Sequence, residues 1–193
     1  MPQLKKTEHI IEKIVIQIQA LLKKKEFIIV AIDGRCASGK TTLASQLKER
    51  LDCNVIHADE FFLRPSQRTA ERLATPGGNV DYERLLEEVI LPLKVNREFA
   101  YRPYDCKTGS LKEPIQVKPN NITIVEGSYS CHPKLWDHYD LRIFLTIEEN
   151  LQKERIRERN TDMAEVFFQK WIPMEEMYFK AYTIAERCDI RTE

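Results

Sequence analysis

The octapeptide GRCASGKT constrains what this chain can fold into more than any other segment. It matches the pattern GxxxxGK[ST] through Gly34, Gly39, Lys40 and Thr41. In that pattern the glycines let backbone N–H groups converge on phosphate oxygens, and the loop must join a buried strand to a helix. Both neighbours are indicated, because the apolar run FIIVAIDG precedes the loop and KTTLASQLKERL, with leucines four residues apart, follows it. An ordinary glycine turn before a helix would leave Lys40 and Thr41 unexplained.

The loop predicts how a nucleoside triphosphate is held. Lys40 is expected to reach the β and γ phosphates, and the Thr41 hydroxyl is expected to ligate Mg²⁺. The helix that starts after Gly39 adds a favourable dipole toward the anion. We therefore expect a nucleoside triphosphate with Mg²⁺, bound by Gly34, Ala37, Ser38, Gly39, Lys40, Thr41 and Thr42. The loop alone does not distinguish a kinase from a switch GTPase or a motor ATPase.

The rest of the chain alternates strands with helices, which is typical of a parallel α/β sheet. Further strands are predicted at NVIHAD (54–59), NITIVEG (121–127) and LRIFLTI (141–147). The expected fold class is therefore α/β, a three-layer α/β/α P-loop NTPase fold with a parallel sheet. At this length the whole chain, residues 1–193, is expected to form a single domain.

Three segments lie outside the predicted strand–helix alternation. They are an N-terminal amphipathic helix (1–25), an insertion (60–120) and a helical region (150–172). The insertion holds a helix near 81–95 and an irregular hairpin that turns at Gly109. Long excursions from a compact sheet are usually functional, so we assign the insertion to binding the phosphoryl acceptor. The helical region follows a predicted capping box made by Thr146 and Glu149.

Composition narrows the classes of partner. Lys+Arg and Asp+Glu are equal at 30 each, so the summed field offers no general attraction for nucleic acid or for an anionic membrane. No uninterrupted apolar run approaches the roughly 20 residues that a membrane span needs. The five cysteines are widely spread and never form CxxC, which favours reduced thiols and a cytoplasmic location. A homo-oligomer remains open.

Two carboxylates stand at the ends of predicted strands. Asp59 ends the second strand, and Glu126 ends the third just before Gly127. Both belong to the C-terminal edge of a parallel sheet, where ligands of open α/β folds bind. Phosphoryl transfer needs charge neutralisation near Mg²⁺ and a proton acceptor at the attacked hydroxyl, and one acid for each task would suit it. The alternative for each acid is a helix cap or a surface salt bridge.

The segments HADEFF, NVDYERL, RPYD, IVEG and LTIEENLQKERIRER occur in the order found in the uridine kinase and phosphoribulokinase-like group of P-loop kinases. The chain resembles that group over roughly residues 27–180. The resemblance implies that Asp59 is the general base at the acceptor hydroxyl and that Glu126 lies near Mg²⁺. It also implies that Arg155 and Arg159 are catalytic residues of a helical lid over the ATP phosphates. The two arginines share a helix face, and their alternative is pairing with neighbouring glutamates of the same helix.

The same resemblance suggests which residues bind the acceptor. Asp81 matches an aspartate that holds ribose hydroxyls, Tyr104 matches a tyrosine against the nucleobase, and Phe62 replaces a tyrosine. Gly109 stands where uridine kinases typically carry a histidine, and Leu111 stands where they carry an arginine. Losing polar groups that read a base edge can relax specificity by orders of magnitude. Kinase chemistry is therefore better supported than uridine as the acceptor.

We thus expect an ATP- and Mg²⁺-dependent kinase that phosphorylates a hydroxyl of a small molecule, with uridine or cytidine as the leading acceptor. Pantothenate or a sugar phosphate remains an alternative acceptor. A guanine-nucleotide switch would carry an NKxD motif, and the sequence has none. A non-catalytic nucleotide-binding regulator is disfavoured because Lys40, Thr41, Asp59 and Glu126 occur together.

Three further residues are assigned no function from the sequence. His57 lacks metal-ligand spacing and is interpreted as a packing or surface residue. Phe167 and Trp171 are interpreted as part of a helix-packing stripe.

Overall fold

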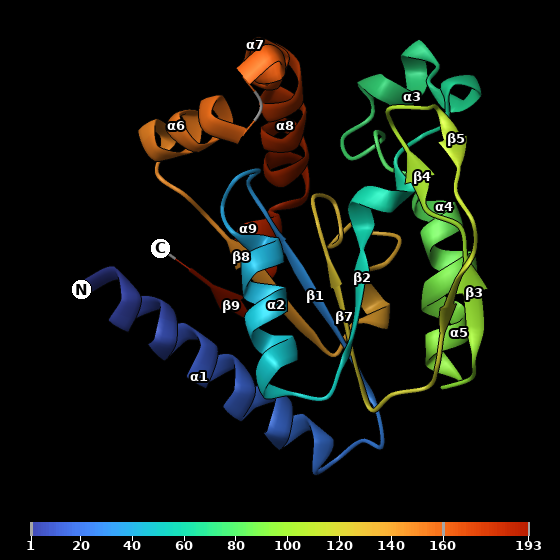
Figure 1. Ribbon diagram of the computed structural model, residues 1–193, viewed down its shortest axis with the longest axis vertical. Coiled ribbons are helices and arrows are strands. Elements are labelled where there is room, and N and C mark those ends of the chain that lie inside the picture. The colour runs from blue at the N-terminus through green and yellow to red at the C-terminus, as the bar shows by residue number, and fades with distance from the viewer. Residues whose placement is uncertain (1, 160, 193) are drawn as a thin grey trace.

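The computed structural model describes residues 2–159 and 161–192, and its centre is a five-stranded sheet in the order β2-β7-β1-β8-β9 (Figure 1). The strands are β1 (Ile28–Gly34), β2 (Asn54–His57), β7 (Ile122–Glu126), β8 (Leu141–Leu145) and β9 (Ile190–Arg191). Every neighbouring pair is parallel. The predicted α/β class is confirmed, and all four predicted strands are present. The edge strand β9 was not predicted, because two residues are too short to produce a pattern.

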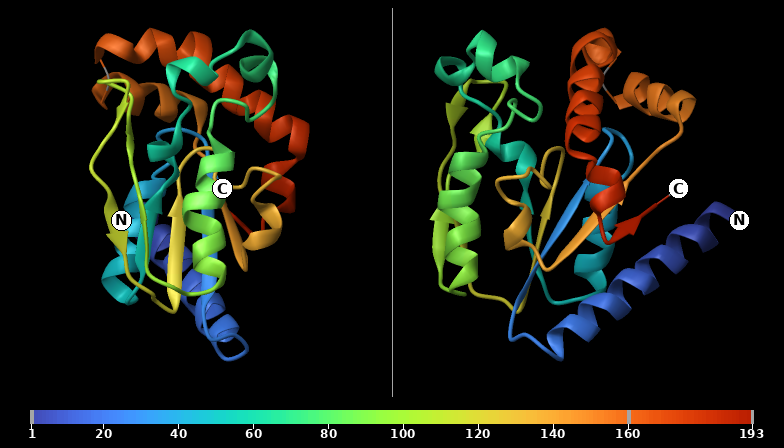
Figure 2. Two further views of the ribbon diagram at one scale, coloured as in Figure 1. Left: turned by 90° about the vertical axis from the view of Figure 1, so that its right-hand side faces the viewer. Right: turned by 180° about the vertical axis from the view of Figure 1, so that it is seen from behind.

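The sheet is covered by helices on both faces, which makes three layers (Figure 2). On one face lie α1 (Pro2–Leu22) and α2 (Lys40–Arg50). On the other lie the helix of the insertion and the last two helices of the chain (172–182 and 184–187), so residues of β1 alternate between two apolar clusters. Ile28, Val30 and Ile32 pack toward α1 and α2, while Ile29 and Ala31 pack toward the opposite layer. This alternation explains the continuous apolar run in the sequence.

The first helix ends at Leu22, three residues before the predicted boundary. The backbone N–H groups of Lys24 and Lys25 both donate to the carbonyl of Leu21, which closes the helix in a turn. The Lys25 ammonium then pairs with Asp140 at the start of β8. Residue 1 of the predicted 1–25 range lies outside the described residues. Within those residues no helix is both long enough and apolar enough to span a bilayer.

The insertion between β2 and β7 forms a lobe beside the sheet (Figure 1). Its helices are α3 (Ala70–Ala74) and a continuous run of α4 (Tyr82–Leu85), the π-helical turn η3 (Leu86–Ile90) and α5 (Leu91–Lys94). Its hairpin consists of β3 (Phe99–Tyr101), β4 (Tyr104–Asp105), β5 (Ser110–Leu111) and β6 (Ile115–Val117). β3 pairs with β6 and β4 with β5, both antiparallel. The predicted helix and the predicted hairpin with its turn at Gly109 are confirmed.

After β8 the chain forms the C-terminal helices. They are α6 (Glu149–Arg159), α7 (Ala164–Val166), the π-helical turn η6 (Phe167–Trp171), α8 (Ile172–Tyr182) and α9 (Ile184–Arg187). The predicted capping box is wrong. Glu148 caps α6 by accepting from the Leu151 N–H at 3.0 Å, while the Thr146 hydroxyl accepts from Arg35 at 2.6 Å. Residue 160 of the predicted 150–172 region lies outside the described residues.

Candidate active site

The P-loop lies at the edge of the sheet where β1 ends, with α6 to α8 on one side and the insertion on the other (Figure 1). Gly34 has a φ of 137°, and a Cβ atom there would lie 2.0 Å from the carbonyl oxygen of Leu145 on β8. Only glycine fits this close approach without strain. The loop therefore leaves the sheet directly beside β8 and turns into α2 at Gly39.

Lys40 and Thr41 open α2 and face the end of β7. The Lys40 side chain is buried, and its ammonium donates to the carbonyls of Gly34 and Arg35 at 2.8 and 3.0 Å. The Thr41 hydroxyl lies 3.2 and 3.3 Å from the two carboxylate oxygens of Glu126. Hydroxyl and carboxylate oxygens are the ligands that Mg²⁺ takes from proteins that bind nucleotides. This pair therefore fits the metal site that the sequence predicts.

His57 holds Glu126 from the neighbouring strand. The two residues are register partners in β2 and β7, and His57 Nδ1 lies 2.5 Å from Glu126 Oε1. This hydrogen bond is the main reason that the pKa of His57 is raised. The interpretation of His57 as a packing or surface residue missed this contact. The sequence did offer one clue to this contact. His57 and Glu126 both lie near the ends of predicted parallel strands, which meet at one edge of the sheet.

Asp59 lies in the 3₁₀ turn η1 (Ala58–Phe61), because β2 ends at His57 rather than at Asp59 as predicted. Its side chain is exposed to solvent within the cleft, although protein atoms surround it closely. That crowding raises the pKa of Asp59, and the negative charge of Glu126 raises it further, whereas the Lys40 ammonium opposes both. Asp59 thus meets Lys40 and Glu126 at the same sheet edge, as the strand-end argument predicted.

Three adjoining cavities follow this edge. The outer cavity, about 550 Å³, lies between the P-loop and α6. The central cavity, about 200 Å³, lies over Lys40, Thr41 and Glu126. The insertion cavity, about 250 Å³, lies under the insertion. Arg159 lines both the outer and the central cavity, and Asp59 lines both the central and the insertion cavity.

The predicted nucleotide-binding residues gather around the outer and central cavities. Both cavities are lined by Ala37, Gly39 and Thr42; the outer cavity adds Ser38, and the central cavity adds Lys40 and Thr41. Gly34 contributes its carbonyl to Lys40 instead of lining a cavity. The arrangement offers one space for a nucleotide and another, beyond Asp59, for a second substrate.

The helix α6 approaches the P-loop through its arginines. Arg155 donates to the carbonyl of Ala37 at 3.0 Å. Both Arg155 and Arg159 line the outer cavity. Arg157 points elsewhere, with its guanidinium 5.2 Å from the ring centroid of Phe168. The shared face that the i,i+4 spacing predicted therefore points toward the loop.

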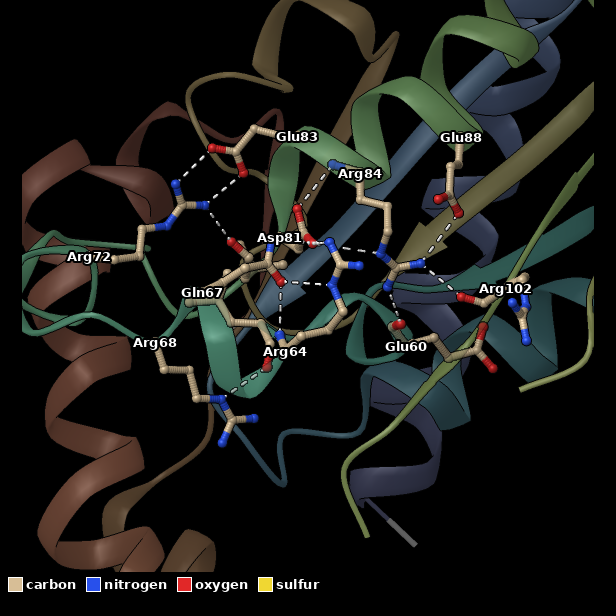
Figure 3. Close-up of polar contacts among 12 residues, drawn as sticks. Glu60, Arg64, Gln67, Arg68, Arg72, Asp81, Glu83, Arg84, Glu88 and Arg102 are labelled. Atoms are coloured by element: carbon tan, nitrogen blue, oxygen red, sulfur yellow. Dashed lines mark hydrogen bonds and ion pairs between the residues drawn. The ribbon is translucent and has the colours of Figure 1, made fainter. Parts of the chain in front are cut away.

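The structure does not bring Asp81 into the lining of the insertion cavity. Asp81 is 2% exposed and caps α4 by accepting from the Arg84 N–H at 3.2 Å. Its second oxygen accepts from Gln67 at 2.8 Å and lies 4.0 Å from Arg64 (Figure 3). The helix start and these partners already use the carboxylate that the resemblance assigns to ribose hydroxyls.

Tyr104 is likewise buried and absent from the residues that line the insertion cavity. Its hydroxyl lies beneath the hairpin turn, 3.9 Å from where a Cβ atom on Gly109 would stand. Phe62, the third residue that the resemblance assigns to the acceptor, does line the cavity. The other aromatic walls are Tyr129, Phe167 and Trp171. The interpretation of Phe167 and Trp171 as a packing stripe missed this role, because helical spacing alone does not show which face meets a cavity.

Two buried carboxylates that the sequence interpretation passed over hold the loop in place. Glu175 on α8 accepts from the backbone N–H of Cys36 at 2.9 Å and from Ser128 at 2.6 Å, and burial raises its pKa. The thiol of Cys36 has a pKa raised to about 12, mainly by burial, with the charge of Glu175 adding to it. Asp33, at the end of β1, is fully buried.

Asp33 anchors the segment after β7 to the strand before the P-loop. Its carboxylate accepts from the N–H groups of Gly34, Tyr129 and Cys131 and from the hydroxyl of Tyr178, at 2.7 to 3.1 Å. Asp33→Ala is expected to lower the free energy of unfolding by about 3 kcal/mol or more, because buried donors lose their acceptor. Urea unfolding measures this.

The matched control is Asp52→Ala, at an exposed position, which should stay within about 0.5 kcal/mol of wild type. A loss in Asp33→Ala as small as that of the control would contradict the anchoring role.

Comparisons with known proteins give a consistent picture. The Phosphoribulokinase / Uridine kinase family profile matches residues 29–166. The chain is 27% identical over 171 residues to the uridine kinase of Ureaplasma parvum serovar 3, covering 81% of this chain and 83% of that protein. It is 28% identical over 183 residues to the uridine kinase of Haemophilus ducreyi, covering 82% and 81%. The structure of a possible uridine kinase from Bacillus stearothermophilus shares the fold, with a TM-score of 0.74 and 19% identity over 100% of both chains.

Proposed function

Because the chain belongs to the phosphoribulokinase/uridine kinase family, we propose that it is an ATP- and Mg²⁺-dependent kinase acting on a hydroxyl of a small molecule. The pyrimidine nucleosides uridine and cytidine are the leading acceptors, with the 5′-hydroxyl as the attacking group. One observation carries this proposal: Asp59 stands in the wall shared by the central cavity beside the P-loop and the insertion cavity. A proton acceptor at that place suits transfer from one bound substrate to the other.

The residues of the chain divide the work of the transfer. Backbone N–H groups of the P-loop and the Lys40 ammonium bind the phosphates and stabilise charge as it moves to the leaving ADP. Asp59 accepts the proton of the acceptor hydroxyl. The hydroxyl oxygen bonds to the γ-phosphorus as the bond between that phosphorus and the bridging oxygen of ADP breaks. Thr41 and Glu126 would hold Mg²⁺, which neutralises phosphate charge when bound. His57 keeps the Glu126 carboxylate oriented.

An anionic acceptor is a second candidate, favoured by Arg68. This arginine lines the insertion cavity, and its Nε donates to the carbonyl of Leu63 at 2.9 Å, which fixes the direction of the guanidinium. A guanidinium pairs well with phosphate or carboxylate. A sugar phosphate or pantothenate would present such a group.

The deciding experiment is ADP release measured with ATP and Mg²⁺ against a panel of uridine, cytidine, pantothenate and sugar phosphates. Uridine and cytidine should both be used, with similar kcat/KM values. Preference for an anionic alcohol, lost in Arg68→Gln, would replace nucleosides by the second candidate. If none of the acceptors in the panel supported ADP release, the proposal of a nucleoside acceptor would be contradicted.

The lid arginine Arg155 supplies a further prediction. Arg155→Ala should lower kcat/KM for ATP by about tenfold to a hundredfold, because a charge-assisted hydrogen bond to phosphate is worth about 1.5–3 kcal/mol. Arg157→Ala on the same helix is the matched control, since Arg157 points toward Phe168. Steady-state titration of ATP at saturating acceptor distinguishes the two variants. Equal effects would mean that α6 contributes only general positive charge.

A further inference from the structure

Asn79 is a largely buried residue whose side chain lines the insertion cavity. Asn79 is 7% exposed and lines this cavity together with Asp59. Among the residues 2–159 and 161–192 that the structure describes, its side chain makes no hydrogen bond. Its amide atoms stay open to the cavity, where water can hydrogen-bond them. A ligand that enters the cavity would replace that water and meet the amide directly.

The backbone on both sides of Asn79 is fixed by one arginine. Arg72 donates from Nε to the carbonyl of Gly78 at 3.0 Å and from Nη2 to the carbonyl of Val80 at 3.0 Å. The carbonyl of Asn79 itself accepts from the Leu63 N–H at 3.3 Å. Three consecutive carbonyls are therefore held, and the side chain between them is aimed from a rigid support.

Arg72 is held in turn by the start of α4 (Figure 3). Its two Nη atoms bind the two carboxylate oxygens of Glu83, both at 2.7 Å, and its guanidinium lies 4.3 Å from the ring centroid of Tyr82. A Cβ atom on Gly78 would lie 1.9 Å from the carbonyl oxygen of Arg72, so the two segments touch backbone to backbone. Such a network orders the 77–80 turn before any ligand arrives, which lowers the cost of binding.

The other walls of the insertion cavity define the kind of group that reaches Asn79. Four aromatic side chains surround the space: Phe62, Tyr129, Phe167 and Trp171. Aromatic walls favour a flat ring. A carboxamide carries a donor and an acceptor side by side. It complements a ring edge with the same paired groups, which are N3–H and a carbonyl in uracil, or N3 and an amino group in cytosine.

We propose that Asn79 is the residue that reads the hydrogen-bonding edge of a planar pyrimidine acceptor, and that Arg72 positions it. This inference rests on the proposed function, since it names the group that recognises the acceptor. It places base recognition on the 77–80 turn rather than on the hairpin, where Gly109 and Leu111 offer no polar side chain. Either orientation of the amide satisfies one of the two bases, so cytidine competes with uridine.

The test compares uridine with N3-methyluridine, whose methyl group blocks the edge but leaves the ring and ribose unchanged. With the wild-type protein, kcat/KM for N3-methyluridine should be at least about tenfold lower, because a buried amide then stays unpaired. In Asn79→Ala the kcat/KM for uridine should fall by a similar factor, and the ratio between the two nucleosides should approach one. Asn54→Ala is the control, since that amide donates to Lys118 at the opposite edge of the sheet.

Arg72→Gln tests the positioning role through the same ratio, which a loss of stability alone would not change. An unchanged ratio in Arg72→Gln overturns that role, and equal methyl penalties in wild type and Asn79→Ala overturn the reading role. Equal use of both nucleosides by the wild type overturns it without any variant. If the protein turns over pyrimidine nucleosides but Asn79→Ala leaves the ratio of uridine to N3-methyluridine unchanged, the role of Asn79 is overturned and the proposed function stands. If it turns over no nucleoside, both the role of Asn79 and the proposed nucleoside acceptor are overturned.

Discussion

Lys40→Ala is expected to retain less than about a hundredth of the wild-type kcat, because one preorganised donor at a developing charge is typically worth a hundredfold or more. The P-loop N–H groups bind phosphate oxygens but carry no full charge, so they cannot replace an ammonium as negative charge moves toward ADP. The Lys40 ammonium is already held at the mouth of the loop by the carbonyls of Gly34 and Arg35. Steady-state rates at saturating ATP and acceptor measure the loss.

Lys48→Ala removes the same charge from an exposed position on the same helix and is the matched control. It should keep the wild-type rate. A Lys40→Ala variant that keeps more than about a tenth of wild-type kcat would contradict the assignment of the P-loop to phosphoryl transfer.

Asp59→Asn is expected to separate chemistry from nucleotide binding. The amide keeps the size of the side chain but accepts no proton at the acceptor hydroxyl, so kcat should fall by about a hundredfold or more. Affinity for ATP with Mg²⁺ should stay within a few-fold, since the base acts in the chemical step. Calorimetry with an unreactive ATP analogue, beside turnover measurements, distinguishes these effects.

Asp137→Asn, at an exposed position outside all three cavities, controls for the loss of one carboxylate. If binding of ATP and Mg²⁺ fell together with the rate in Asp59→Asn, Asp59 would be a metal ligand. The proton acceptor would then have to be another residue.

The sheet was predictable because its strands are buried on both faces, and a continuous apolar run is a local signal. Element ends were less predictable, since they depend on contacts with distant residues. The first helix ends at Leu22, and Lys25, which was expected to lie in it, instead pairs with Asp140 just before β8. Likewise, α6 begins at Glu149 with Glu148 as its cap, and the hydroxyl of Thr146 accepts a hydrogen bond from Arg35 of the P-loop.

Much of the site was predictable for a geometrical reason. Parallel strands end at the same edge of the sheet, so Lys40, Asp59 and Glu126 were expected at one edge once the strands were recognised. That they lie close together also depends on the order of the strands, which places β2, β7 and β1 side by side. What the sequence could not show is which partner each polar group finds. Asp81 caps a helix, a role that an aspartate just before a helix start commonly has, but the resemblance directed attention to a ligand instead. His57 holds a carboxylate of the neighbouring strand, and the order of the strands in the sheet, on which that contact depends, cannot be read from the sequence.

The insertion leaves the sheet after β2 and returns at β7, the neighbouring strand. Its polar contributions to the insertion cavity, Arg68 and Asn79, come from the excursion, whereas Tyr129, Phe167 and Trp171 come from outside it. Residues of the excursion can therefore change the walls of the insertion cavity without altering the P-loop, which lies on β1 and α2.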